Sequence, residues 1–243
     1  MLQLPHSDVV GSLLRPTELT IARHDQAKGA LSQLAFTEIE DRAVDQAIAL
    51  QHDVGLEVIT DGEMRRLSFQ SQVPEAVEGF GEYDINAFLW GDWYGDQQVG
   101  DLSVHRPKEL GVVGKLRRKR YIATAEFVYL RDRTNRIPKV TLPSPSLFAN
   151  FWSESKSTHA YPTIEAFLSE VASILHEEVE MLTRLGATYI QLDAPHYPLV
   201  LNPKWADFYN SLGWTAESWL SHSVELDNTV IKGFPDVTFA IHL

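Results

Sequence analysis

Two apolar, β-branched runs of this chain each end in an acid: LEVITDGE at residues 56–63 and TYIQLD at residues 188–193. A buried strand cannot easily hold a charge, whereas its carboxyl end can present one to a ligand. A third run, VTFAIHL at residues 237–243, brings His242 to the same relative position. In a barrel of parallel strands, ligands bind at the carboxyl ends. These runs therefore predict parallel strands that carry functional groups at their ends.

Helical patterns lie between the strand-like runs. Residues 164–185 carry apolar side chains at helical spacing, with Thr163 as the N-cap and Gly186 as the stop. Residues 38–54 have similar spacing, and Thr37 with Glu40 fits a capping box. We expect strands at residues 8–14, 56–60, 111–116, 139–142, 187–193 and 237–241, and helices at residues 38–54, 164–185 and 216–230, the last capped by Thr215. Residues 121–133 fit either a helix or a strand, and we favour a helix because a parallel crossover needs one.

The alternation of strands and helices predicts an α/β fold, specifically a TIM (β/α)8-type barrel. A closed barrel of this type needs eight strands, whereas this sequence supplies about six β or βα units. We expect residues 1–243 to form a single partial barrel domain, with an excursion over one mouth at about residues 64–110. The last predicted strand ends within an apolar run and leaves an open edge. We therefore expect the barrel to be truncated before its last two strands.

Composition argues against several classes of protein. The net charge of −12 argues against nucleic acid as the main partner. No run approaches the roughly 20 apolar residues that a membrane-spanning helix needs. Cysteine is absent, so the chain has no disulfide and no thiolate ligand of its own. The first residues show no signal peptide, and we expect a cytoplasmic protein.

Two segments in the first third of the chain are candidates for ligand binding. Gly11 lets the backbone approach a ligand, and Ser12 adds a hydroxyl; the alternative is an ordinary turn. Asp61 and Glu63 follow an apolar run and are themselves followed by two arginines. Such carboxylates suit a substrate ammonium, and arginines suit a carboxylate. The alternative is a solvated, charged turn.

Two later strand ends carry further candidates. Asp193 could bind an amine or accept a proton, or it could cap the next element. His242 could bind zinc as a neutral imidazole, or it could be a buried or terminal histidine. Residues 115–120 contain five cations in six positions, which fits a solvated loop or a contact with an anionic substrate tail. The sequence lacks a Walker loop, a Rossmann glycine fingerprint, a G-x-S-x-G elbow and an H-E-x-x-H motif.

Taken together, several segments resemble the cobalamin-independent methionine synthase family, both its C-terminal catalytic barrel and its shorter stand-alone members. The matching segments are residues 6–16, 55–66, 113–115, 139–145 and 189–193, in the family's order. The resemblance implies a (β/α)8 barrel related to uroporphyrinogen decarboxylase. It also implies a zinc ion that binds a thiol substrate as the thiolate for transfer of a methyl or alkyl group.

The resemblance implies roles for five residues and no catalytic residue. Gly11 and Ser12 are expected to hold the carboxylate of homocysteine, and Glu63 and Asp193 its ammonium. His242 is expected to be the first zinc ligand. The implied partners are a small thiol amino acid and a methyl donor, 5-methyltetrahydrofolate or a related compound, with a homo-oligomer left open. Neither nucleic acid nor membrane is expected as a partner.

This sequence also departs from the family pattern. The family's next zinc ligand, a cysteine, would follow Leu243, and Pro143-Ser144-Pro145 stands in place of the tryptophan that packs on folate. Two other functions therefore remain as alternatives. One is a metal-independent decarboxylase-like or lyase-like barrel that uses Glu63, Asp193 and the arginines. The other is a catalytically incomplete barrel fragment that acts through a partner chain.

Overall fold

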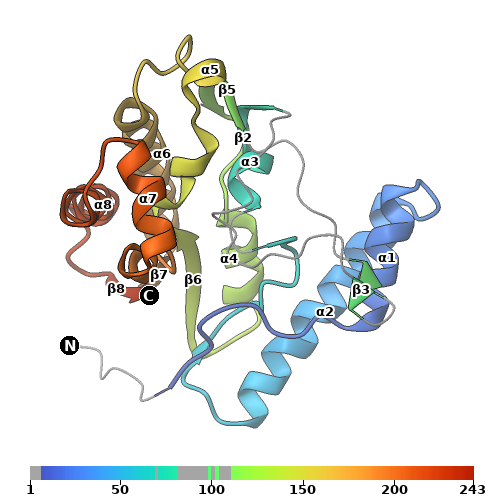
Figure 1. Cartoon of the computed structure of the whole chain (residues 1–243). Helices are drawn as coiled ribbons and strands as arrows, with labels where there is room; N and C mark the ends of the chain where they lie inside the picture. The colour runs from blue at the N-terminus through green and yellow to red at the C-terminus, as the bar shows by residue number, and fades with distance from the viewer. Residues whose placement is uncertain (1–6, 69–70, 82–97, 100–101, 104–110) are drawn as a thin grey trace.

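Four parallel strands form the central sheet of the structure, a computed structural model that describes residues 7–68, 71–81, 98–99, 102–103 and 111–243 (Figure 1). The strands are β1 (Val58–Ile59), β6 (Ile137–Pro143), β7 (Tyr189–Asp193) and β8 (Thr238–His242), in the spatial order β1-β6-β7-β8. Every neighbouring pair in this sheet is parallel. Parallel neighbours need crossover connections, which helices supply here. The predicted α/β alternation is confirmed.

The four predicted helices are all present. They are α2 (Gln33–Asp53), α4 (Thr124–Arg131), α6 (Ile164–Arg184) and α8 (Ala216–Ile231). In Figure 1, α6 and α8 gather with α7 (Pro203–Ser211) beside β6, β7 and β8. The pair of α1 (Thr17–Ala27) and α2 lies on the other side of the molecule. None of the helices in the described part of the chain is long and apolar enough to cross a membrane.

Local capping signals predicted two helix starts correctly and one wrongly. Thr163 accepts a hydrogen bond from Ala166 N at 3.2 Å, and Thr215 forms a capping box with Ser218. The start of α2 was predicted at Thr37, but its N-cap is Ser32, which accepts from Ala35 N at 3.2 Å. The hydroxyl of Thr37 instead donates to a backbone carbonyl one turn earlier. The helix begins sooner because Ser32 already satisfies one of the free amides of its first turn.

The predicted strand at residues 8–14 is wrong. This segment has no strand geometry in the structure, because side chains rather than a neighbouring strand satisfy its carbonyl groups. Lys139 Nζ donates to Val9 O at 2.6 Å, and Gln191 Nε2 donates to Val10 O at 2.7 Å. One backbone bond, from Leu13 N to Gly62 O at 3.1 Å, ties the segment to the turn after β1.

The predicted strand at residues 111–116 exists but does not join the parallel sheet. It is β5 (Gly111–Arg118), which pairs antiparallel with β2 (Val77–Gly81). Pairing with β2 supplies hydrogen-bond partners for the backbone groups along one edge of β5. The backbone amide of Leu116 instead donates to the Tyr161 hydroxyl at 2.8 Å. The predicted excursion at about residues 64–110 includes β2, but most of it lies outside the described residues. The other described elements are α3 (Gln72–Ala76), β3 (Gln98–Val99), β4 (Leu102–Ser103), α5 (Glu154–Ser157), η2 (Pro145–Phe151) and η3 (Tyr197–Leu201).

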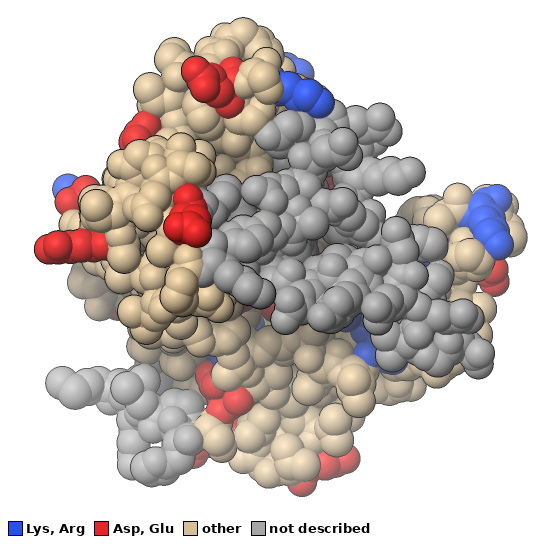
Figure 2. All heavy atoms as spheres, in the orientation of Figure 1, with Lys and Arg blue, Asp and Glu red and all other residues tan. Residues whose placement is uncertain are grey.

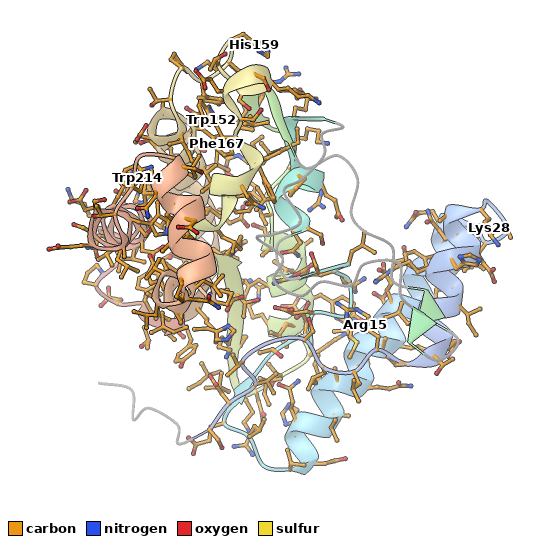
Figure 3. All side chains as sticks on the ribbon, viewed as in Figure 1. Arg15, Lys28, Trp152, His159, Phe167 and Trp214 are labelled. Carbon is orange, nitrogen blue, oxygen red and sulfur yellow. The ribbon has the colours of Figure 1, made fainter. Side chains whose placement is uncertain are left out.

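The described residues bury two hydrophobic clusters. The larger centres on α6, where Phe167 is fully buried (Figure 3), and extends across β6 and β7 to α8. The smaller lies between α1, α2 and β1. Phe127 of α4 belongs to the larger cluster and Leu130 to the smaller one. Helix α4 therefore marks the boundary between the two clusters, and the polar groups described next gather at that boundary.

Candidate functional site

The carboxyl ends of β7 and β8 bring two predicted residues together. The parallel register places Asp193 opposite His242. Asp193 Oδ1 lies 3.2 Å from His242 Nδ1. Asp193 is 3% exposed, whereas the imidazole lies partly open to solvent. The strand-end position inferred from the sequence therefore holds for both side chains.

The turn after β1 places Glu63 in a strained backbone conformation. Its φ is 55°, which is rare for a residue other than glycine. Asp61 Oδ1 stabilises the turn by accepting from Glu63 N at 2.9 Å. Gly62 also has a positive φ of 67°, and an added Cβ would lie 3.0 Å from Ala47 Cβ. A left-handed non-glycine residue costs about 1–2 kcal/mol, so the surrounding contacts hold Glu63 in place.

Three side chains hold the Glu63 carboxylate. Ser12 Oγ donates to Oε2 at 2.5 Å, Thr141 Oγ1 donates to Oε1 at 2.7 Å, and Arg66 Nη1 donates to Oε1 at 3.0 Å. The segment with Gly11 and Ser12 thus meets the acid after β1. The Ser12 hydroxyl is bonded to Glu63 in this structure.

Glu63 and Asp193 form an electronegative pair. Burial raises the pKa of Asp193, the Gln191 amide opposes that rise by hydrogen bonding, and the charge of Glu63 raises the pKa further. Each negative charge therefore makes the other less favourable, and a cation near both carboxylates would offset that effect. The arrangement suits an ammonium group.

A buried ion-pair network behind Glu63 was missed in the sequence. Arg66 donates through Nη2 to Glu126 Oε2 at 3.0 Å, and Gln72 donates to the other oxygen of Glu126. Burial raises the pKa of Glu126 to about 7, because the lost hydration outweighs the attraction of Arg66. Arg15 and Arg23 donate to the Arg66 carbonyl at 2.8 and 3.1 Å (Arg15 is labelled in Figure 3). No local pattern marks Glu126, since its partners lie 54 and 60 residues away.

A buried lysine and glutamine were also missed. Lys139 and Thr141 alternate along β6, and Gln191 and Asp193 alternate along β7, so all four face the same side of the sheet. All four are buried. Polar side chains at every second position of two otherwise apolar strands are the sequence signal that could have revealed this face.

A small cavity lies among these groups. Its volume is about 10 Å³, roughly the space of one water molecule. It lies between the segment at residues 8–14, which contributes Gly11, the turn after β1, α4 and β6. The polar residues that line it are Thr60, Asp61, Glu63, Arg66, Glu126, Lys139 and Thr141. Among the described residues, Asp61 Oδ2 is a buried atom with no hydrogen-bond partner.

The described residues do not fit a zinc site. Zinc in proteins is held by three or four nitrogen, sulfur or oxygen ligands. Within the described ranges, no group of three or more histidine, cysteine, aspartate or glutamate side chains could hold a metal ion. His242 has one such neighbour, Asp193, with which it already shares a hydrogen bond.

A second polar cluster lies beyond the ends of β6 and β7. Ser146 Oγ lies 2.7 Å from His196 Nε2, and Ser144 Oγ donates to Asp227 Oδ1 at 2.8 Å. Burial lowers the pKa of His196 to about 3, so its imidazole is neutral at physiological pH. Tyr197 donates to the second oxygen of Asp227. His196 is thus a packed, buried histidine.

The basic run at residues 115–120 makes surface pairs. Arg117 pairs with Glu78, Arg120 with Glu75, and Lys115 lies 4.1 Å from the centroid of the Tyr161 ring. On the face drawn in Figure 2, the charged side chains of the described residues are scattered rather than gathered in one patch. Both observations agree with the interpretation of a solvated segment.

Parallel strands, crossover helices and acids at the strand ends define a TIM-barrel-type α/β protein with polar side chains gathered at the carboxyl ends of its strands. The family model of the catalytic domain of cobalamin-independent synthase matches residues 5–233. The chain belongs to this family, as its sequence motifs predicted. Its named relatives include methionine synthases and 5-methyltetrahydropteroyltriglutamate–homocysteine methyltransferases, which makes this a methyltransferase family.

Individual relatives agree with this assignment. The chain is 31% identical to a methionine synthase of Pyrococcus abyssi over 79% of its own length and 52% of the relative. It is 25% identical to the uncharacterized protein YxjH of Bacillus subtilis over 98% of its own length and 60% of the relative. The chain thus spans little more than half of these two relatives. The structure of a putative vitamin-B12 independent methionine synthase from Listeria monocytogenes has the same fold, with a TM-score of 0.72 at 21% identity, covering 98% of this chain and 64% of that one.

Proposed function

We propose that this chain forms the amino-acid-binding part of an enzyme that transfers a methyl or alkyl group to the thiol of homocysteine. The observation that carries the proposal is the pair of buried carboxylates, Glu63 after β1 and Asp193 at the end of β7, two strands that flank β6 in the sheet. Membership of a methyltransferase family supports it.

In this proposal the substrate ammonium lies between Glu63 and Asp193 and relieves their repulsion. The segment with Gly11 and Ser12, tied to Glu63 at 2.5 Å, faces the substrate carboxylate. The sulfur end of the substrate then points toward His242, next to Asp193. These roles of the five residues are predictions.

Zinc, the donor and the location belong to the same proposal. His242 is the one proposed zinc ligand, by resemblance to the family. The methyl donor is 5-methyltetrahydrofolate or a related compound, with Pro143-Ser144-Pro145 at the place of the folate-packing tryptophan. We place the reaction in the cytoplasm, where a thiol substrate stays reduced.

Isothermal titration calorimetry with L-methionine tests the amino-acid site. We expect Glu63→Gln and Asp193→Asn each to weaken binding by about tenfold or more, because each removes a charge-assisted contact. The analogue 4-(methylthio)butanoic acid, which lacks the amino group, should bind poorly to the unmodified chain. Glu38→Gln, an exposed substitution in α2, is the matched control and should bind normally. Equal affinity for L-methionine and the analogue, or no binding of L-methionine, would contradict the proposal.

A further inference from the structure

A buried lysine uses all its hydrogen-bonding capacity beneath the candidate site. The Lys139 side chain is fully buried. Its ammonium donates to Asp8 Oδ2 at 2.9 Å, to Val9 O at 2.6 Å and to Gln191 Oε1 at 2.8 Å. A lysine ammonium has three donors and no acceptor. Every donor of Lys139 is therefore matched, and one of them is directed at the neighbouring strand.

The lysine fixes the orientation of the Gln191 amide. Because an ammonium can only donate, the amide atom that faces Lys139 must be the oxygen. The amide nitrogen of Gln191 is then directed the other way. It donates to Val10 O at 2.7 Å and to Asp193 Oδ1 at 2.6 Å. All of the polar atoms in this side chain are thus used in a single arrangement.

This one amide joins the two sides of the candidate site. Val10 precedes Gly11 and Ser12, which are proposed to face the substrate carboxylate. Asp193 is proposed to bind the ammonium. The oxygen of Asp193 held by Gln191 is the same one that meets His242, so these contacts leave Oδ2 for a ligand.

We propose that Gln191 is a positioning residue that sets the spacing between the turn at Gly11 and Ser12 and the Asp193 carboxylate. Lys139 fixes the orientation of the Gln191 amide. This inference rests on the proposed function, because the spacing matters for an amino acid that is held at both ends. Gln191 does not touch the substrate in this scheme. It acts through the Val10 carbonyl and through the Asp193 carboxylate.

The variant Gln191→Met tests the inference, since it keeps the approximate size and removes both donors. Gln191→Glu keeps the shape but cannot donate to Asp193. Ser157→Ala is the matched control. It also removes a buried hydrogen bond, from Ser157 Oγ to Val112 O at 2.7 Å, but in the β5 region. If Gln191 positions the site, both Gln191 variants should weaken L-methionine binding by about tenfold. Their weak affinity for 4-(methylthio)butanoic acid should change little, and Ser157→Ala should alter neither.

Hydrogen exchange of residues 8–12 gives a readout that needs no ligand. We expect Gln191→Met to speed exchange in this segment, and Lys139→Met to do the same, while Ser157→Ala leaves it unchanged. Unchanged exchange in Gln191→Met would overturn the inference, as would an equal loss of affinity for both ligands. If the unmodified chain does not bind L-methionine, the proposed function fails, and the exchange of residues 8–12 still decides whether Gln191 holds the turn.

Discussion

At the scale of single residues, the site depends on a turn that forces an acid inward. Glu63 adopts φ 55° directly after Gly62 at φ 67°. Gly62→Ala would add the cost of a left-handed alanine and a Cβ 3.0 Å from Ala47 Cβ. We expect a loss of about 2–4 kcal/mol in the free energy of unfolding, measured by urea denaturation, with weaker L-methionine binding.

The control for this prediction is Gly213→Ala. Gly213 also has a positive φ, of 84°, but nothing lies within 4 Å of an added Cβ. Gly213→Ala should lower the free energy of unfolding by only about 1–2 kcal/mol, because it adds the cost of a left-handed alanine without a close contact. Equal losses at the two glycines would show that the close approach to Ala47 does not matter.

A second prediction at this scale concerns pH. The pKa of Glu126 is raised from an ordinary value near 4.5 to about 7. Between these values the folded chain keeps a proton that the unfolded chain releases, so the stabilising contribution falls as pH rises. Glu126→Gln cannot titrate, and its free energy of unfolding relative to the unmodified chain should therefore improve from pH 5 to pH 7. Urea denaturation across this range measures how the free energy of unfolding changes with pH. Glu225→Gln, a substitution at an exposed residue, is the control. Parallel curves for the unmodified chain and Glu126→Gln would contradict the assigned titration.

Sequence patterns predicted the strand-end residues but not their supporting network. Glu63, Asp193 and His242 each follow an apolar run, which is a local signal. Lys139 lies inside such a run, where a charge is unexpected. Its partners Asp8 and Gln191 are 131 and 52 residues away, and only the folded sheet brings them together.

At the scale of elements, α4 shows why one helix was ambiguous. Its N-cap position is Ala123, which offers no side-chain cap. The cap comes instead from the fully buried Glu178 of α6, which accepts from Ile122 N at 2.7 Å and from Ala123 N at 2.8 Å. Because this cap is supplied from another helix, the residues of α4 alone could not reveal it. The predicted starts at Thr163 and Thr215 succeeded because those caps are local.

Removal of this cap should be costly. Glu178→Ala leaves two buried backbone donors and the Thr124 hydroxyl without their acceptor. We expect a loss of about 3 kcal/mol or more in the free energy of unfolding, measured by urea denaturation. Glu180→Ala in the same helix breaks only a surface pair with Arg184 and should lose less than about 1 kcal/mol. A small loss in Glu178→Ala would mean that water replaces the cap.

At the scale of the whole molecule, the chain brings together the residues of the proposed amino-acid site more completely than ligands for a zinc ion. One connected network of hydrogen bonds includes side chains from residues 8–14, the turn after β1, β6 and β7. The parallel order β1-β6-β7-β8 creates that meeting point. Alternation along the sequence predicted parallel strands with connecting helices, but not their order in the sheet. The antiparallel pairing of β5 with β2 was not predictable in the same way, because strand patterns do not specify the partner.

Zinc binding tests this difference between the two halves. Within the described residues, His242 has only Asp193 beside it, and a stable tetrahedral site needs more ligands. After incubation with zinc and exhaustive dialysis, the chain should retain well below one equivalent by elemental analysis. His242→Ala should lower zinc uptake measured at equilibrium, whereas His159→Ala, at an exposed histidine (Figure 3), should not. One zinc per chain that survives dialysis would show that ligands other than His242 and Asp193 complete the site. L-methionine binding should be the same with and without added zinc, since in the proposed binding mode Glu63 and Asp193 hold the ammonium end of the ligand.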